Sequence, residues 1–577
     1  MQRNYDVVVA GSGIAGSITA LVLQQSGIRT LVVERDSHPR FAIGESTLPT
    51  TTFLLRRMAE RYGIPELAEI CSYEGLRKNG CAAWPKQIFW FGVHREGLPL
   101  ETRHECVNEA LLAPLGPDVH MVRSDVDAFL ASLLGRYHVD YVEHAGVVAF
   151  DAHADHAQLK IRTPDGEFDV SAQLVVDATG HASGLARQLA LRDPQPRLHT
   201  DTRSIFGHFR GARDLDAALG GANPGMRFRR QAGTQHHCFA GGWFWVIPFD
   251  NDITSVGLQL DRRVFPRQDG LSPHDEFRAF IERFPDVRAH LGDLEAVRPL
   301  VATDRIQFTS RTLLADRFIA TPHAATFVEP LFSTGIMLTL SFIDRLAPAL
   351  KAAHARNDWR TEQFRFVERL LFAEVEQIDR LVDGTIRSFR DYDLFKQYWR
   401  AWVIGTFVQY GCCVLADGAT TEGPMLYGAG MPGFVQSLQR MYELVCDATQ
   451  PAAKQAAAVK QLIDPWWKRL AEPIITPIGE FSLDSPGSLN VMADPTAPNA
   501  VGAFFRELAV LHAFAEPGKN LRNVVDWLGR ATQDYHRYVA AYRQSKADGT
   551  SLYRYVDAIF DLARPGMFEY RSSVGIV

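Results

Sequence analysis

Apolar positions near the start of the chain follow the pattern of a βαβ unit. A short apolar run over 6–10 ends in glycines, as expected of a buried parallel strand. The spacing over 14–25 predicts an amphipathic helix, and the apolar run over 30–34 predicts a second strand. The first domain is therefore predicted to be α/β.

Later apolar stretches extend this domain and then give way to helices. Runs over 174–178 and 317–321 predict further parallel strands, and alternation over 168–173 and 253–260 predicts an inserted antiparallel sheet. We therefore expect a discontinuous Rossmann-like module over 1–350 and a helical domain over 351–577 that covers a substrate pocket. The helical spacing predicts helices over 358–407, 432–447, 451–470, 501–515 and 523–547, with a glycine-rich loop or lid hinge at 418–430.

Charge and cysteine content exclude several classes of protein. A net charge of −6 provides no basic field for nucleic acid. No apolar stretch is long enough to cross a membrane, and the N-terminus lacks the pattern of a signal peptide. The 7 cysteines are scattered, which predicts a cytoplasmic protein without a disulfide framework. His236 and His237 lack a third ligand at metal spacing, so no metal site is predicted.

The loop between the first strand and helix has the sequence GSGIAG, a dinucleotide fingerprint. Its glycines allow a tight turn and let a pyrophosphate approach the helix N-terminus. An acidic residue about twenty positions downstream is suited to bind ribose hydroxyls. The predicted nucleotide-binding residues are Gly11, Gly13, Ile14, Ala15, Gly16, Glu34 and Arg35.

Two segments favour FAD over NAD through a resemblance to the flavin monooxygenase superfamily. Asp177 begins DATG, which looks like the DxTG strand end of that superfamily. Arg123 resembles its arginine near the flavin ribityl chain, although a surface salt bridge with Asp125 or Asp127 is an equal alternative. The family's Gly-Asp-Ala is replaced by TPHAA at 321–325, which implies weaker FAD binding or binding of the reduced form only. The chain shows no second glycine-rich fingerprint, so a separate NAD(P)H flavin reductase is expected to supply FADH2.

Three further motifs together resemble the flavin-dependent halogenases. They are FAIGESTLP at 41–49, GWFWVIP at 242–248 and FVEPLFSTGI at 327–336. Other segments, such as RYGIPEL at 61–67, look like the branch that holds the pyrrolnitrin-type pyrrole halogenase and the phenol halogenase of the pyoluteorin cluster. The resemblance runs from the N-terminus to about residue 350 and more loosely to about 406.

The resemblance implies a reaction and assigns residues to it. Reduced FAD and O2 give a flavin hydroperoxide; chloride or bromide attacks it, and a lysine relays the resulting hypohalous acid to the arene. Lys86 is our choice for that lysine and Lys78 is the rival. Trp243 and Trp245 line the tunnel and keep the arene from the flavin. The remaining implied residues are Gly44, Ser46, Phe332, Gly335 and Ile336 near flavin, Ser333, Thr334 and Gly335 for halide, and Glu45 as a catalytic carboxylate.

The substrate and the base are less defined. Tryptophan halogenases carry glutamate where this chain has Phe332, so a small electron-rich phenol or pyrrole is expected, and the base stays unassigned; Glu45 and Glu329 are candidates. The aromatic residues Phe389, Tyr392, Tyr398 and Trp399 either clamp a flat ring or form helix-packing core. Alternative functions are a single-component NAD(P)H aromatic hydroxylase, a flavoprotein that only binds ligand, and a halogenase of a carrier-tethered arene.

Overall fold

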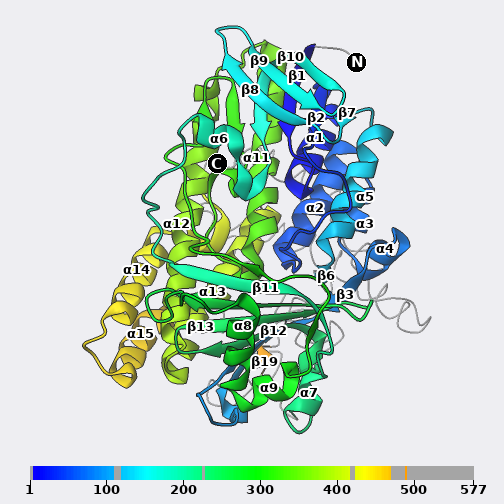
Figure 1. The fold of residues 1–577 in the computed structure, drawn as a ribbon. Coiled ribbons are helices and arrows are strands. Elements are labelled where there is room, and N and C mark those ends of the chain that lie inside the picture. Colours follow the sequence, from blue (N-terminus) through cyan, green and yellow to red (C-terminus); the bar gives the residue numbers. More distant parts are fainter. Residues whose placement is uncertain are drawn as a thin grey trace, which may run out of the picture.

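The computed structural model describes residues 4–109, 118–223, 226, 228–415, 423–468 and 488–489. The predicted βαβ unit lies in a mainly parallel sheet at the top of Figure 1. Along the sheet the strands run β17 (Leu314–Ala315), β18 (Phe318–Ala320), β10 (Gly166–Asp177), β1 (Asn4–Ala10), β2 (Thr30–Val33) and β7 (Asp140–Val142), with β9 (Ala157–Thr163) and β8 (Gly146–Ala152) attached to β10. This order places the ends of β1, β2 and β10 side by side.

A second, mainly antiparallel sheet lies below the first (Figure 1). Its order is β15 (Glu295–Ala296), β11 (Thr202–Arg210), β14 (Thr254–Asp261), β13 (Gly242–Pro248), β12 (Gly233–Phe239), β4 (Ile88–Val93), β5 (Glu105–Glu109) and β19 (Ser488–Leu489), with β16 (Val301–Ala302) on β11. A short ribbon of β3 (Ala83–Lys86) and β6 (Asp118–Met121) joins the two sheets. The predicted inserted sheet is thus present.

Helices cover both sheets. On the first module lie α1 (Ile14–Gln25), α2 (Pro49–Tyr62), α3 (Glu66–Glu69), α4 (Tyr73–Lys78), α5 (Arg123–Arg136), α6 (Gly184–Gln188), α10 (Pro322–Ala325) and α11 (Thr334–Arg356). Near the second sheet lie α7 (Leu215–Ala218), α8 (Pro273–Glu282) and α9 (Pro285–Leu291). The later helices are α12 (Arg365–Ser388), α13 (Tyr392–Leu415), α14 (Pro432–Cys446) and α15 (Ala452–Trp466). None of the helices in the described ranges is long and apolar enough to cross a membrane.

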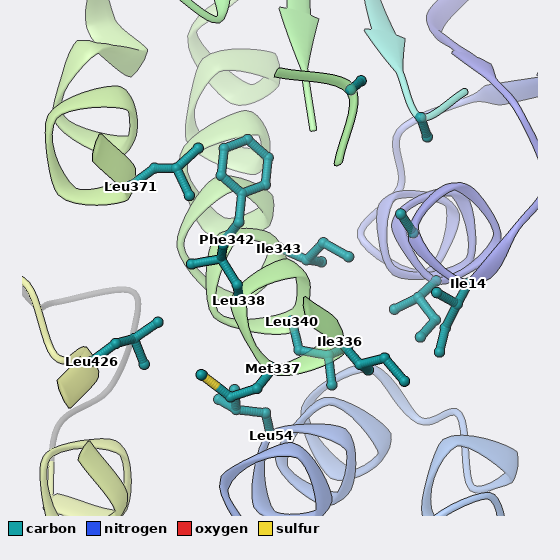
Figure 2. Close-up of a cluster of buried hydrophobic side chains, with 14 of the residues drawn as sticks. Ile14, Leu54, Ile336, Met337, Leu338, Leu340, Phe342, Ile343, Leu371 and Leu426 are labelled. Atoms are coloured by element: carbon teal, nitrogen blue, oxygen red, sulfur yellow. The ribbon is translucent and has the colours of Figure 1, made fainter. Parts of the chain in front are cut away.

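Helix α11 is the packing centre between the first module and the later helices. Figure 2 shows its apolar side chains directed toward Ile14 of α1, Leu54 of α2 and Leu371 of α12. Met337, Leu340 and Phe342 on α11 are at most 1% exposed. The helix continues through the expected boundary at residue 350, and the division into two domains remains a prediction.

Two predicted elements differ in their bounds for local reasons. The segments 168–173 and 174–178 form the single strand β10, whose first half pairs antiparallel with β9 and whose second half pairs parallel with β1. Its exposure changes from alternating to continuous burial at the same point, which explains the two sequence patterns. The predicted helix 358–407 is two helices, because Asp391 accepts a hydrogen bond from the Leu394 N–H and caps α13. The predicted helices at 501–515 and 523–547 lie outside the described residues, as does the first part, 418–422, of the predicted hinge at 418–430.

Candidate active site

The loop between β1 and α1 forms a cradle that only glycine fits. Gly11 has φ +96°, and a Cβ there would lie 2.7 Å from the Ala178 carbonyl oxygen. A Cβ on Gly16 would lie 1.9 Å from the Gly11 carbonyl oxygen. The end of β10, which carries Asp177, therefore packs directly on the fingerprint, and Asp177 accepts hydrogen bonds from Thr179 and Ser183. This backbone leaves the N-terminus of α1, with Ile14 and Ala15 in its first turn, suited to a pyrophosphate.

Glu34 stands at the end of β2 beside this cradle. It is 5% exposed and accepts hydrogen bonds from the Ser12 N–H at 2.8 Å and from Arg40 at 3.3 Å. Burial alone would raise its pKa, but the Asp36 and Ser12 N–H donors and Arg40 hold the pKa below its usual value. The carboxylate is thus charged and placed where a ribose would lie, whereas the neighbouring Arg35 is exposed and pairs with Asp36.

Arg123 is not on the surface. Its guanidinium forms a pair with Asp127 at 3.0 Å and donates to the Ile43 carbonyl at 2.9 Å. The salt bridge with Asp127 that the sequence offered as an alternative is therefore present, but it is buried and not on the surface. A Cβ on Gly44 would lie 3.3 Å from the same guanidinium. Arg123 therefore ties the 43–44 loop to the base of the dinucleotide cradle, and together the glycines, Glu34 and Arg123 fit FAD.

The two candidate lysines occupy opposite environments. Lys86, at the end of β3, is 0% exposed; its Nζ donates to the Ser46 hydroxyl at 2.8 Å and to the Thr47 carbonyl at 2.6 Å, and lies 3.4 Å from the centre of the Phe89 ring. Burial lowers the pKa of Lys86 from 10.5 to about 7. Lys78 has a side chain 69% exposed and pairs with Glu69. Only Lys86 has the environment expected of a reactive amine.

The sequence did not reveal two polar groups beside Lys86. Asp118 on β6 is directly opposite Lys86 in the β3–β6 ladder and is 0% exposed. His120, two positions further on, closes a chain of hydrogen bonds that runs from Lys86 through Ser46 and Thr234, with steps of 2.9 Å from Ser46 to Thr234 and from Thr234 to His120. Both residues lie on a four-residue strand, and no motif marked them.

The tryptophan pair lies on one face of β13. Trp243 and Trp245 have ring centres 5.9 Å apart and are at most 5% exposed. The Trp243 indole N–H donates to Glu329 at 2.9 Å, and burial raises the pKa of Glu329 to about 8. Trp243 also lies 5.4 Å from the ring of His236, which stacks on Phe91. The pair is thereby joined to the 327–336 segment and to the strand that follows Lys86.

Gly257 leaves the space that the Trp245 indole fills. It is directly opposite Trp245 in the β13–β14 ladder, and a Cβ there would lie 2.1 Å from the indole. We expect Gly257→Ala to displace Trp245 and to lower the free energy of unfolding by about 1–3 kcal/mol, the usual range for overpacking. Thermal unfolding and product formation measure the effect. Gly146→Ala, which meets nothing within 4 Å, is the control and should match the wild-type protein in both.

The segment before α11 turns sharply through two left-handed residues. Phe332 has φ +71° and Ser333 has φ +56°, after which Thr334, Gly335 and Ile336 begin the helix. The first N–H groups of a helix have no partner within it and attract anions. Gly335 is needed because a Cβ there would lie 2.9 Å from the His323 imidazole. The turn can therefore present backbone donors to a halide ion, next to a neutral histidine whose pKa burial lowers to about 4.

The remaining candidates are Glu45 and the histidines of the second sheet. Glu45 is buried and pairs with His208 at 2.8 Å. His237 is held between His94 and His290, and His236 bonds to the Trp90 carbonyl, so these histidines support the second sheet. The prediction that they bind no metal stays a prediction.

The aromatic residues that were predicted to clamp a flat ring have different surroundings. Tyr398 donates to the Arg380 carbonyl and fills the space above Gly384, so it is helix-packing core. Tyr392 donates to the Glu105 carbonyl. Trp399, in contrast, lies 6.2 Å from Phe91 and 6.0 Å from Trp402.

Trp402 itself stacks on Phe332 at 4.5 Å. The aromatic face of α13 therefore packs over the same cluster as Phe91 and Phe332, next to the site, and Trp402 is a member that the sequence did not suggest.

Comparisons with known proteins agree with this geometry. The tryptophan halogenase family model matches residues 6–80 and 101–383, more than half of the chain. Monodechloroaminopyrrolnitrin halogenase PrnC of Pseudomonas fluorescens is 34% identical over 489 residues, which cover 80% of this chain and 85% of PrnC. Tetracycline 7-halogenase of Kitasatospora aureofaciens is 34% identical over 416 residues, covering 70% of this chain and 74% of that enzyme.

The fold is similar to that of solved halogenases. The crystal structure of halogenase PltM in complex with phloroglucinol and FAD has a TM-score of 0.74 at 28% identity and covers 80% of this chain and 96% of PltM. The crystal structure of PltM alone has a TM-score of 0.77 and covers 84% of this chain. The expected α/β flavoprotein fold with a helical C-terminal region is confirmed, and the chain belongs to the tryptophan halogenase family of flavin-dependent halogenases.

Proposed function

We propose that this enzyme uses FADH2, O2 and chloride or bromide to halogenate a free, small, electron-rich arene such as a phenol or pyrrole. The observation that carries the proposal is the buried Lys86 amine, held by Ser46 and Thr47 within a cluster of aromatic rings. In a site closed to solvent, this side chain binds hypohalous acid without competition from water, whether it is a neutral amine or an ammonium group.

Residues of this chain divide the remaining work. Reduced FAD, when bound, activates O2 and so supplies the oxidant that converts halide to hypohalous acid. The glycine cradle, Glu34 and Arg123 bind the cofactor, and the turn at Ser333, Thr334 and Gly335 binds halide through N–H donors. Trp243, which donates to Glu329, and the adjacent Trp245 exclude the arene from the cofactor. Lys86 hydrogen-bonds the hypohalous acid and directs it to the ring.

The substrate proposal rests on the aromatic cluster that Phe89 links to Lys86. Phe91, Phe332 and Trp402 offer flat apolar faces, and Phe332 brings no carboxylate to assist a poorly activated ring. Phenols and pyrroles need less assistance because their own O–H or N–H group stabilises the cationic intermediate. PltM was solved with phloroglucinol, a phenol, which supports the same class.

The proposal includes a partner and a location. FADH2 is expected from a separate NAD(P)H flavin reductase, since the described fold holds one dinucleotide cradle. We place the enzyme in the cytoplasm. Five cysteines are free thiols, as in a reducing compartment: Cys71, Cys81, Cys106, Cys238 and Cys446.

Mass spectrometry of the product tests the function. The enzyme is incubated with a flavin reductase, NADH, bromide and a panel of free phenols, pyrroles and indoles. We expect a brominated phenol or pyrrole, and none when the reductase is left out. A product that gains oxygen would instead identify an aromatic hydroxylase. Turnover only of an arene tethered to a carrier protein would overturn the free-substrate proposal.

A further inference from the structure

Asp118 has the position and burial of a partner for Lys86. The two residues are directly opposite in the antiparallel β3–β6 ladder, so their side chains leave the ribbon on the same face. Both are 0% exposed. The Lys86 amine has two acceptors, the Ser46 hydroxyl and the Thr47 carbonyl, neither of which carries charge. Its charge is therefore not balanced by any group that it hydrogen-bonds.

The Asp118 carboxylate is itself incompletely satisfied. Its Oδ1 accepts from the Thr52 hydroxyl at 3.2 Å, while its Oδ2 is buried and has no hydrogen-bond partner among the described residues. A buried carboxylate with a free oxygen is costly unless it is protonated or faces a cation. Lys86, opposite Asp118 in the ladder, is the cation that acts on it electrostatically.

The two histidines near the pair are neutral near pH 7, and the nearby glutamate has its own partner. His120 on β6 and His236 on β12 interact with Lys86, and burial lowers the pKa of both, that of His236 to about 3. Glu45, in the loop beside Ser46, is paired with His208. Helix α2 contributes the Thr52 hydroxyl to the pair. Asp118 is thus the one charged group that acts on the lysine within the described residues.

We propose that Asp118 is a positioning residue that acts on Lys86 electrostatically across the β3–β6 ribbon and thereby sets the charge of the reactive amine. When the Lys86 ammonium gives up a proton and the Asp118 carboxylate takes one up, the net transfer leaves a neutral amine and a neutral carboxylic acid. The pair has zero net charge before and after the transfer, so the exchange does not require an unpaired charge in the closed site. The proposal rests on the proposed function, in which Lys86 holds hypohalous acid.

The pH dependence of the pair supports this role. Burial raises the pKa of Asp118 to about 7 and lowers that of Lys86 to about 7, so the two groups compete for a proton near neutral pH. The carboxylate raises the pKa of the lysine, and the ammonium lowers that of the aspartate. Removing Asp118 should therefore lower the pKa of Lys86, and removing Lys86 should raise the pKa of Asp118.

Infrared titration tests the pair without requiring activity. The difference between wild-type protein and Asp118→Asn isolates the carbonyl band of the protonated Asp118 side chain from those of Glu329 and other buried acids. We expect this band to disappear as the pH rises through about 7, and to persist to higher pH in Lys86→Met. A band that titrates like an ordinary carboxyl group, or that Lys86→Met does not move, would overturn the proposal whether or not the protein halogenates.

The pH profile of halogenation supplies the second readout. The side of the pH–rate profile that follows the titration of Lys86 is its Lys86 limb. In Asp118→Asn we expect this limb to move to lower pH and the maximal rate to fall at least about tenfold. Asp118→Glu should restore much of both the limb position and the rate. Asp379→Asn, a buried carboxylate that binds the Thr200 hydroxyl far along α12, is the matched control and should leave the limb in place. If the wild-type protein halogenates and the pH profile of Asp118→Asn superimposes on the wild-type profile, the proposed role of Asp118 is contradicted and the proposed function is not. If the wild-type protein adds no halogen, the proposed function itself is contradicted.

Discussion

Replacing Lys86 with methionine is expected to lower the rate of halogenation about 10²- to 10⁴-fold, the usual loss for a group that acts directly on a reacting atom. Consumption of reduced flavin by O2 should continue, because Lys86 contacts Ser46 and Thr47 rather than the dinucleotide cradle. The oxidation of FADH2 is followed by stopped-flow absorbance, and the product by mass spectrometry. Methionine is chosen because it fills most of the space of a fully buried side chain without its charge.

Lys78→Met is the matched control for this result. Lys78 is exposed and pairs with Glu69 at the surface, and exposed ion pairs contribute little to stability. Its variant should halogenate at the wild-type rate. Loss of product in Lys78→Met together with retained product in Lys86→Met would reassign the reactive lysine to position 78.

Gly16→Ala is expected to weaken FAD binding and to destabilise the first module. The new Cβ would lie 1.9 Å from the Gly11 carbonyl oxygen, and backbone on both sides prevents either atom from moving freely. Overpacking of this kind costs about 1–3 kcal/mol. If half of that cost falls on the bound state, the affinity for FAD drops by about tenfold or less, and a distorted pyrophosphate site lowers it further. Fluorescence titration with FAD and thermal unfolding measure both effects.

The control for Gly16→Ala is Gly135→Ala on α5. Gly135 lies in a helix, and a Cβ there would meet nothing within 4 Å. Alanine at such a helical position stabilises by up to about 1 kcal/mol. We therefore expect unchanged FAD affinity and an equal or higher melting temperature. An FAD affinity for Gly16→Ala equal to that of Gly135→Ala would show that the cradle does not bind the cofactor.

The sequence predicted those elements whose conformation depends on residues that are close together in the chain. The predicted helix 14–25 and the strands 6–10 and 30–34 agree with α1, β1 and β2 within two residues, because their apolar periodicity is the periodicity of the element. Gly11 and Gly16 of the fingerprint are required by contacts within the strand–turn–helix unit itself and with the end of the adjacent β10. The resemblance to halogenases rested on short continuous motifs and is confirmed at the level of the family.

The tertiary structure decided which polar side chains are buried together. Lys86 and Lys78 are eight positions apart and both were candidates, and only packing of the 46–47 loop and Phe89 removes Lys86 from water. From the sequence, a surface salt bridge between Arg123 and Asp127 was as plausible as a flavin-binding arginine. The sequence does not show that the 43–44 loop covers this pair. Asp118 is placed opposite Lys86 by a ladder between strands some thirty residues apart, and the register of that ladder is a property of the folded chain. The sequence therefore determined the fold class, the cofactor cradle and the family, whereas burial, pKa and the partner of the reactive amine were decided by contacts between distant segments, which local periodicity does not encode.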